Sequence, residues 1–188
     1  ICGFNLTCLG DERGFSYTNT PFKDTLADSA LSAALHNKIN LKVFSYLERA
    51  SEERQYCSPG LRLPICTFSK SHLGDYPEYH SSADNLDLVT NNGLEDSKKV
   101  LTLIIDTFEN TNLFPETNTI CEPQLGKRGL YPDLSKLYET EHPAKTRMNF
   151  ISYCDGKKNI FDICKIINCD LKTILNEYKV LNEHGIVR

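Results

Sequence analysis

The stretch ICGFNLTCL at residues 1–9, followed by GDERG at residues 10–14, decides the fold class of this 188-residue chain. The first nine residues are mostly apolar, and the polar pentapeptide bounded by glycines ends the run. A short apolar run that stops at a turn is typical of a buried β-strand. We therefore expect residues 1–9 to form a core strand. Because the sequence starts directly in such a strand, we also expect further sequence upstream of Ile1.

Helical and strand patterns alternate after this first strand. Asp24 or Thr25 can cap a helix whose apolar residues recur on one face. These residues are Leu26, Ala27, Ala30, Leu31, Ala34 and Leu35. Three further strands are predicted, at residues 15–18, 41–46 and 61–68, and the polar segment 48–60 between the last two is predicted to be a loop. A long helix is predicted at residues 94–110. This alternation indicates an α/β fold with a mainly parallel sheet.

A second unit is predicted beyond residue 111. Residues 112–145 are rich in Pro, Gly, Thr and Asn, which is typical of a linker with some fixed structure. Residues 146–188 contain two apolar helical patterns joined by Asn168-Cys169-Asp170, the arrangement of a helix-turn-helix, and Gly185 can cap the second helix. We therefore expect an α/β domain at residues 1–111, a structured linker at 112–145 and a winged-helix domain at 146–188.

Composition narrows the classes of partner. Apolar residues make up 40% of the chain and charged residues 24%, as in globular domains. A net charge of −4 gives no basic field for phosphate backbones, so we do not expect nucleic acid as a partner. The eight cysteines include no Cys-x-x-Cys pair, which favours reduced thiols and a cytoplasmic location over a disulfide framework. No apolar run is long enough for a membrane span. Formation of a homo-oligomer stays open.

The loop at residues 78–85 carries the best candidate for a metal ligand. A neutral imidazole binds zinc well, and a nearby carboxylate commonly fixes its tautomer. This chemistry makes His80 a candidate ligand and Asp84 its supporting carboxylate, although a merely solvated histidine is the alternative. Asp11 is a third candidate because open α/β sheets place their sites at the ends of strands. Its alternative is a turn-forming Gly-Asp pair.

Two segments of the chain resemble the two-zinc aminopeptidases, a superfamily that includes the glutaminyl cyclases. Tyr79–Leu86 resembles the aromatic-His-Thr/Ser-x-x-Asp segment of that superfamily, whose His is a zinc ligand. Ser51–Gly60 resembles its loop beside the active site. The resemblance implies metal-binding roles for His80 and Asp11, and it implies roles in substrate binding for the residues Glu52, Glu53, Arg54 and Tyr56.

The match is closer to a narrower group of bacterial proteins that combine an aminopeptidase-like domain with a C-terminal winged helix and are linked with polysaccharide biosynthesis loci. Glu53–Gly60, Pro77–His80 and Cys121–Pro132 resemble that group along nearly the whole chain. One departure is Glu52, where the group usually has Asp. The resemblance implies that residues 1–111 are the second half of a phosphorylase/hydrolase-like α/β domain.

The implied activity of the complete protein is zinc-dependent hydrolysis of a peptide or of an amide in a small substrate. In the superfamily, one or two zinc ions are held by further His, Asp and Glu ligands, and a Glu is the general base. Those residues precede the strand that opens this chain, so we expect an incomplete site and no activity from these 188 residues alone. Two alternatives stay open: a non-catalytic binding or scaffold protein with a degenerate aminopeptidase fold, and a winged-helix regulator that binds DNA.

Overall fold

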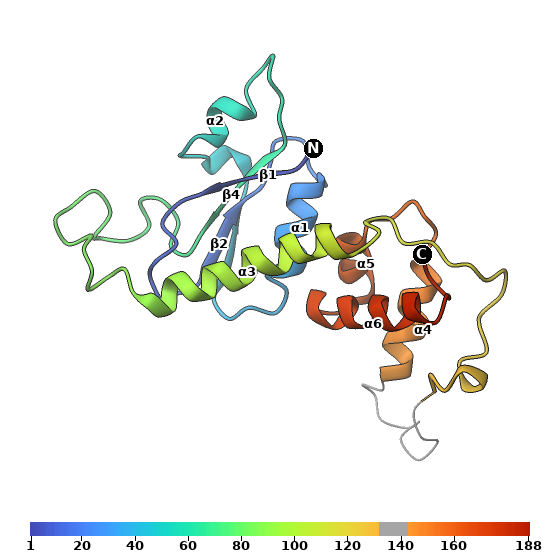
Figure 1. Ribbon diagram of the computed structural model, residues 1–188. Coiled ribbons are helices and arrows are strands. Elements are labelled where there is room, and N and C mark those ends of the chain that lie inside the picture. The colour runs from blue at the N-terminus through green and yellow to red at the C-terminus, as the bar shows by residue number, and fades with distance from the viewer. Residues whose placement is uncertain (132–142) are drawn as a thin grey trace. The chain divides into compact units, whose positions relative to one another are not determined.

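The computed structural model describes residues 1–131 and 143–188, which divide into two compact units, Ile1–Ile104 and Ile105–Arg188 (Figure 1). The first unit contains a β-sheet with helices packed on it, and the second is mainly helical. None of the helices in these two described ranges is both long enough and apolar enough to cross a lipid bilayer.

The sheet of the first unit has four strands: β1 (Gly3–Leu6), β2 (Phe15–Thr18), β3 (Leu41–Phe44) and β4 (Ile65–Ser69). Their order is β1-β4-β2-β3. The outer pairs β1/β4 and β2/β3 are parallel, whereas β2 and β4 are antiparallel. The predicted α/β class is therefore confirmed, but the sheet is mixed rather than mainly parallel. Residues 7–14 are too few for the crossover that parallel strands need, so β2 runs opposite to β1 with β4 between them.

Helix α1 (Leu26–Ala34) is the crossover between the parallel strands β2 and β3. Thr25 caps it as predicted: its hydroxyl accepts from the Asp28 N–H at 3.4 Å, and the Asp28 carboxylate accepts from the Thr25 N–H at 3.0 Å. The same carboxylate accepts from the Cys66 thiol of β4 at 3.2 Å. Helix α1 therefore packs on the face of the sheet to which Cys66 points.

A short helix, α2 (Glu53–Tyr56), lies against β4 on the opposite face. Side chains alternate along a strand, so Thr67 points away from α1, and its hydroxyl donates to Glu53 at 2.7 Å. The polar segment 48–60, predicted to be a loop, contains this helix and follows a 3-10 turn at Tyr46–Glu48. Figure 1 shows α1 and α2 on the two sides of the strands.

Helix α3 (Asn91–Asn110) begins three residues before its predicted start at residue 94 and leads into the second unit. Its first turn is fixed to the loop that follows β1. The Thr90 N–H donates to the Gly10 carbonyl at 2.9 Å, and the Ser97 hydroxyl donates to the Leu9 carbonyl at 2.8 Å. The start of α3 therefore holds the backbone that carries Asp11.

Three helices form most of the second unit: α4 (Pro143–Tyr153), α5 (Ile160–Ile167) and α6 (Leu171–Glu183). Asn159 and Asp170 cap α5 and α6 through their side-chain oxygens, and Gly185 takes the positive φ of 64° expected after a helix. Single β-bridges join Glu116 to Asp155 and Thr117 to Val187. The fully buried side chains of its core include Phe150, Ile160, Phe161, Ile163, Ile174, Leu181 and Ile186.

Candidate functional site

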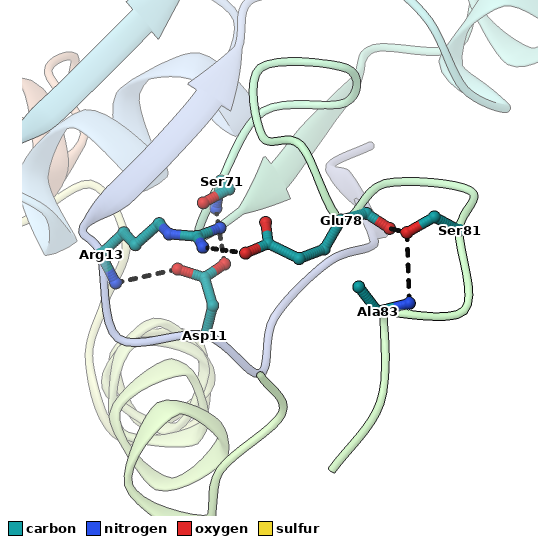
Figure 2. Close-up of polar contacts among 6 residues, drawn as sticks. All are labelled: Asp11, Arg13, Ser71, Glu78, Ser81 and Ala83. Carbon is teal, nitrogen blue, oxygen red and sulfur yellow. Dashed lines mark hydrogen bonds and ion pairs between the residues drawn. The ribbon is translucent and has the colours of Figure 1, made fainter. Parts of the chain in front are cut away.

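The carboxyl ends of β1 and β4 lie at the same edge of the sheet because these two strands are parallel. Asp11 follows β1, and Ser71 follows β4. The Asp11 side chain is buried, with its Oδ1 accepting from the Arg13 N–H at 2.8 Å and its Oδ2 from the Ser71 N–H at 3.1 Å (Figure 2). The carboxylate thus joins the two loops at this edge of the sheet.

A second carboxylate, Glu78, lies beside the Arg13 guanidinium (Figure 2). Arg13 Nη2 is 2.7 Å from Glu78 Oε1, and this hydrogen bond lowers the pKa of the Glu78 carboxyl. Glu78 Oε2 is shielded from solvent and has no hydrogen-bond partner within residues 1–131 and 143–188. The cluster therefore holds two carboxylates around one guanidinium, and one carboxylate oxygen is left without a donor.

His80 lies in an exposed loop two residues after Glu78. Its φ of 57° places it in the left-handed region, and its ring stacks on that of Tyr79 with centroids 4.1 Å apart. The Ser81 hydroxyl orders this loop by donating to the Glu78 carbonyl at 2.8 Å. Asp84 is exposed as well, and in the described part of the chain no hydrogen bond joins its carboxylate to His80. The structure thus brings Asp11 and Glu78 together around Arg13 (Figure 2).

The described residues do not form a complete zinc site. A carboxylate offers about four lone-pair sites, and Asp11 uses one on each oxygen, so both oxygens can still bind a cation. A catalytic zinc needs three protein ligands and a structural zinc needs four. Outside the undescribed residues 132–142, no group of three or more His, Cys, Asp or Glu side chains is arranged to hold a metal ion. Asp11 and His80 are therefore two separate potential ligands.

Glu53, one of the predicted substrate-binding residues, has a different environment from its neighbours. Its side chain is only 1% exposed. Oε1 accepts from the N–H groups of Ala50 at 2.7 Å and Ser51 at 3.0 Å, and Oε2 accepts from Thr67 at 2.7 Å and Asn5 at 3.3 Å. Burial by itself would raise the pKa of Glu53, but these donors outweigh it and leave the pKa below its usual value. The carboxylate fastens the segment at residues 50–56 to β1 and β4.

The other three predicted substrate-binding residues, Glu52, Arg54 and Tyr56, are exposed. Glu52 hydrogen bonds with the Ser51 hydroxyl, and Arg54 Nε donates to the Ser51 carbonyl at 3.1 Å. Arg54 also lines a shallow pocket of about 370 Å³ together with Arg49 and Arg62. These side chains are accessible to a ligand, whereas that of Glu53 is not.

Sequence reasoning missed a cavity of about 430 Å³ beside Asp11. Its wall includes Lys70, Ser71 and His72, which directly follow β4, and Lys42 at the amino end of β3. Lys70 is only 5% exposed. A charged residue placed directly after an apolar strand was the signal that could have indicated this cavity.

Comparison with known proteins gives two family matches. Residues 1–111 match a family described as "Domain of unknown function (DUF4910)", and residues 112–188 match one described as "winged helix-turn-helix". The second match confirms that a winged helix is present, and it includes residues 112–145, which were predicted to form a separate linker.

One curated relative and one crystal structure, both from Clostridium acetobutylicum, are similar to the chain. One is described as "Putative polysaccharide biosynthesis protein with aminopeptidase-like domain" and is 35% identical over 162 residues, which are 86% of this chain and 37% of that protein. The other is a crystal structure described as that of a "putative peptidase", with a TM-score of 0.82 and 30% identity over 100% of this chain and 41% of its own length. The chain thus spans about two fifths of each relative.

Proposed function

We propose, since this chain belongs to the DUF4910 family and its relatives are described as peptidase-like, that it is part of an aminopeptidase-like hydrolase. The bond cleaved would be a peptide bond or an amide in a small substrate. The observation that carries the proposal is the Asp11 carboxylate, which is buried at the carboxyl end of β1 and retains free lone pairs. Ligand sites of α/β sheets commonly lie at this position.

We further propose that the complete protein binds zinc, with Asp11 and His80 as the two ligands from this chain. A bound zinc ion would polarise the scissile carbonyl and lower the pKa of a water molecule. The N–H groups of Arg13 and Ser71 fix the Asp11 carboxylate in one orientation, as hydrogen bonds to ligand side chains do in metal sites. The Arg13 guanidinium offsets the charge that two neighbouring carboxylates would otherwise accumulate.

The remaining ligands and the general base would come from residues outside this chain, because the described residues hold no closed set. We therefore expect the 188 residues alone to be inactive toward amides. The exposed Glu52, Arg54 and Tyr56 would contact the substrate, whereas Glu53 would support their backbone.

Zinc content of the full-length protein tests the proposal. We expect one or two zinc ions per chain and a clear loss of zinc in His80→Ala and Asp11→Asn. His184→Ala is the matched control, because this histidine at the end of α6 is exposed and, among the described residues, its ring hydrogen bonds only with the Val180 carbonyl, at 2.8 Å. A full-length protein without zinc would favour the non-catalytic scaffold. Zinc retained equally in all three variants would show that the ligand assignment is wrong.

A further inference from the structure

The cavity beside Asp11 is lined by a lysine, Lys70, that is almost entirely buried. The cavity is bounded by the amino ends of β2 and β3 and by the loop that follows β4. Lys70 lies in its wall with only 5% of its surface exposed, and Lys70 Nζ is 4.0 Å from the centre of the Phe15 ring. An aromatic face attracts a cation, so Phe15 holds the ammonium at the cavity.

Lys70 differs from the other cations of the cavity because it has no counter-ion among the described residues. Lys42 pairs with Asp75 at 3.4 Å, and Arg13 pairs with Glu78 at 2.7 Å. Within residues 1–131 and 143–188, no hydrogen bond or ion pair reaches Lys70 Nζ.

One further carboxylate, Asp96 of α3, lies in the electrostatic range of Lys70. The pKa of Asp96 is lowered mainly by its hydrogen bond with Lys99, at 3.0 Å, and Lys70 adds only a smaller, more distant effect. Asp96 is thus already paired elsewhere. In the described part of the chain, the charge of Lys70 therefore has no direct partner.

Partial burial of an ammonium is unfavourable where the water that it loses is not replaced by an acceptor. A cation–π contact replaces only part of that hydration. The ammonium has three N–H donors, whereas the Phe15 ring offers no lone pair. A small anion in the cavity would supply the missing acceptors and the missing charge.

We propose that this cavity binds an oxyanion, the carboxylate or phosphate group of a small ligand, against Lys70. Ser71 connects the two sites, because its N–H binds Asp11 while its neighbour in sequence, Lys70, faces the cavity. A substrate cleaved near Asp11 would therefore carry an acidic group. This assignment of the anion to the substrate rests on the proposed hydrolase function, whereas the binding of the anion does not.

Calorimetric titration of the full-length protein with inorganic phosphate, and separately with succinate, tests the proposal at constant ionic strength. We expect saturable binding of at least one anion, and the tighter of the two identifies the class of ligand. Lys70→Met should weaken this binding roughly tenfold or more, because hydrogen bonds to charged groups contribute that much to affinity. Lys42→Met is the matched control. It should change the affinity for the anion by less than about threefold, because an exposed lysine that is already paired contributes little to binding.

Absence of saturable binding by the wild-type protein for both anions would overturn the proposal, and this result does not depend on whether Lys70→Met folds. Binding that survives Lys70→Met but disappears in Asp11→Asn would also overturn it, because the anion would then occupy the candidate metal site. Neither result measures the zinc content of the protein, so the hydrolase proposal is tested by a separate experiment.

Discussion

Gly93 of α3 lies against the backbone of Gly10 so closely that a Cβ atom at position 93 would be 2.0 Å from the Gly10 carbonyl oxygen. The Thr90 hydroxyl accepts from the Gly93 N–H at 3.0 Å, which fixes the first turn of the helix at this point. Gly10 directly precedes Asp11. The absence of a side chain at position 93 therefore allows α3 to support the loop that presents the Asp11 carboxylate.

We predict that Gly93→Ala lowers the free energy of unfolding of the first unit by about 1–3 kcal/mol, as overpacking generally does. A loss of stability would be informative, because replacing Gly by Ala inside a helix normally stabilises a protein by up to about 1 kcal/mol. Urea unfolding measures the change. Gly126→Ala is the control, because an added Cβ there would meet no atom of the described residues within 4 Å apart from its own chain neighbours. A Gly93→Ala protein as stable as the wild type would show that the contact is looser than described.

Glu53 makes stability depend on pH. Its native pKa lies below the value of about 4.3 for an unfolded chain, so the unfolded state takes up the proton first as the pH falls. The stabilisation from Glu53 is therefore complete above about pH 5 and is lost as the pH falls through the native pKa. We predict that the stability of Glu53→Gln falls less than that of the wild type as the pH is lowered. Urea midpoints measured between neutral and acidic pH test this prediction.

The exposed neighbour Glu52 provides the control for this experiment. Glu52→Gln should leave the stability at neutral pH nearly unchanged, whereas Glu53→Ala should lower the free energy of unfolding by about 3 kcal/mol, because Thr67 and Asn5 would lose their acceptor. Equal effects at positions 52 and 53 would contradict the supporting role of Glu53.

Local patterns predicted individual elements well. The Thr25 cap, the strand at Phe15–Thr18 and most of α3 were all evident from residue spacing, because each depends on neighbours within a few positions. The insertion of β4 between β1 and β2 was not evident. It depends on which strands pair across about 60 residues, and apolar spacing carries no information on partners.

The candidate site was predictable only in part for the same reason. Asp11 could be placed at the end of a strand, but the Ser71 N–H that binds it lies 60 residues away. Glu53 was predicted to contact substrate because its segment resembles a loop beside the active site, and only the tertiary contacts with Asn5 and Thr67 show that it is buried. The cavity at Lys70 likewise exists only once β4 has paired with β2.

The winged-helix module should not bind duplex DNA. The exposed cations of α6, Lys172 and Lys179, are accompanied by the exposed Glu183, and Glu177 lies between them in sequence. A recognition helix usually presents several unopposed cations to the groove. We predict a dissociation constant weaker than about 10⁻⁴ M for a fluorescent duplex of random sequence at low salt, the weak end of non-specific binding. Tighter binding that weakens steeply with added salt would support the regulator instead.

The ion pair between Arg147 of α4 and Glu177 of α6 should contribute far more to stability than the pair between Arg188 and Glu116. The first is bidentate, at 2.6 and 3.3 Å, its side chains are 14% and 11% exposed, and Arg147 also donates to the Leu130 carbonyl at 2.6 Å. The second has a 2.6 Å contact, but its side chains are 67% and 46% exposed.

We predict that Arg147→Ala lowers the free energy of unfolding by about 3–5 kcal/mol, because it leaves Glu177 buried without a partner. Arg188→Ala should lower it by less than about 1 kcal/mol. Urea unfolding of both variants in low and high salt measures the difference, and equal losses would mean that solvent screens the Arg147 pair as well.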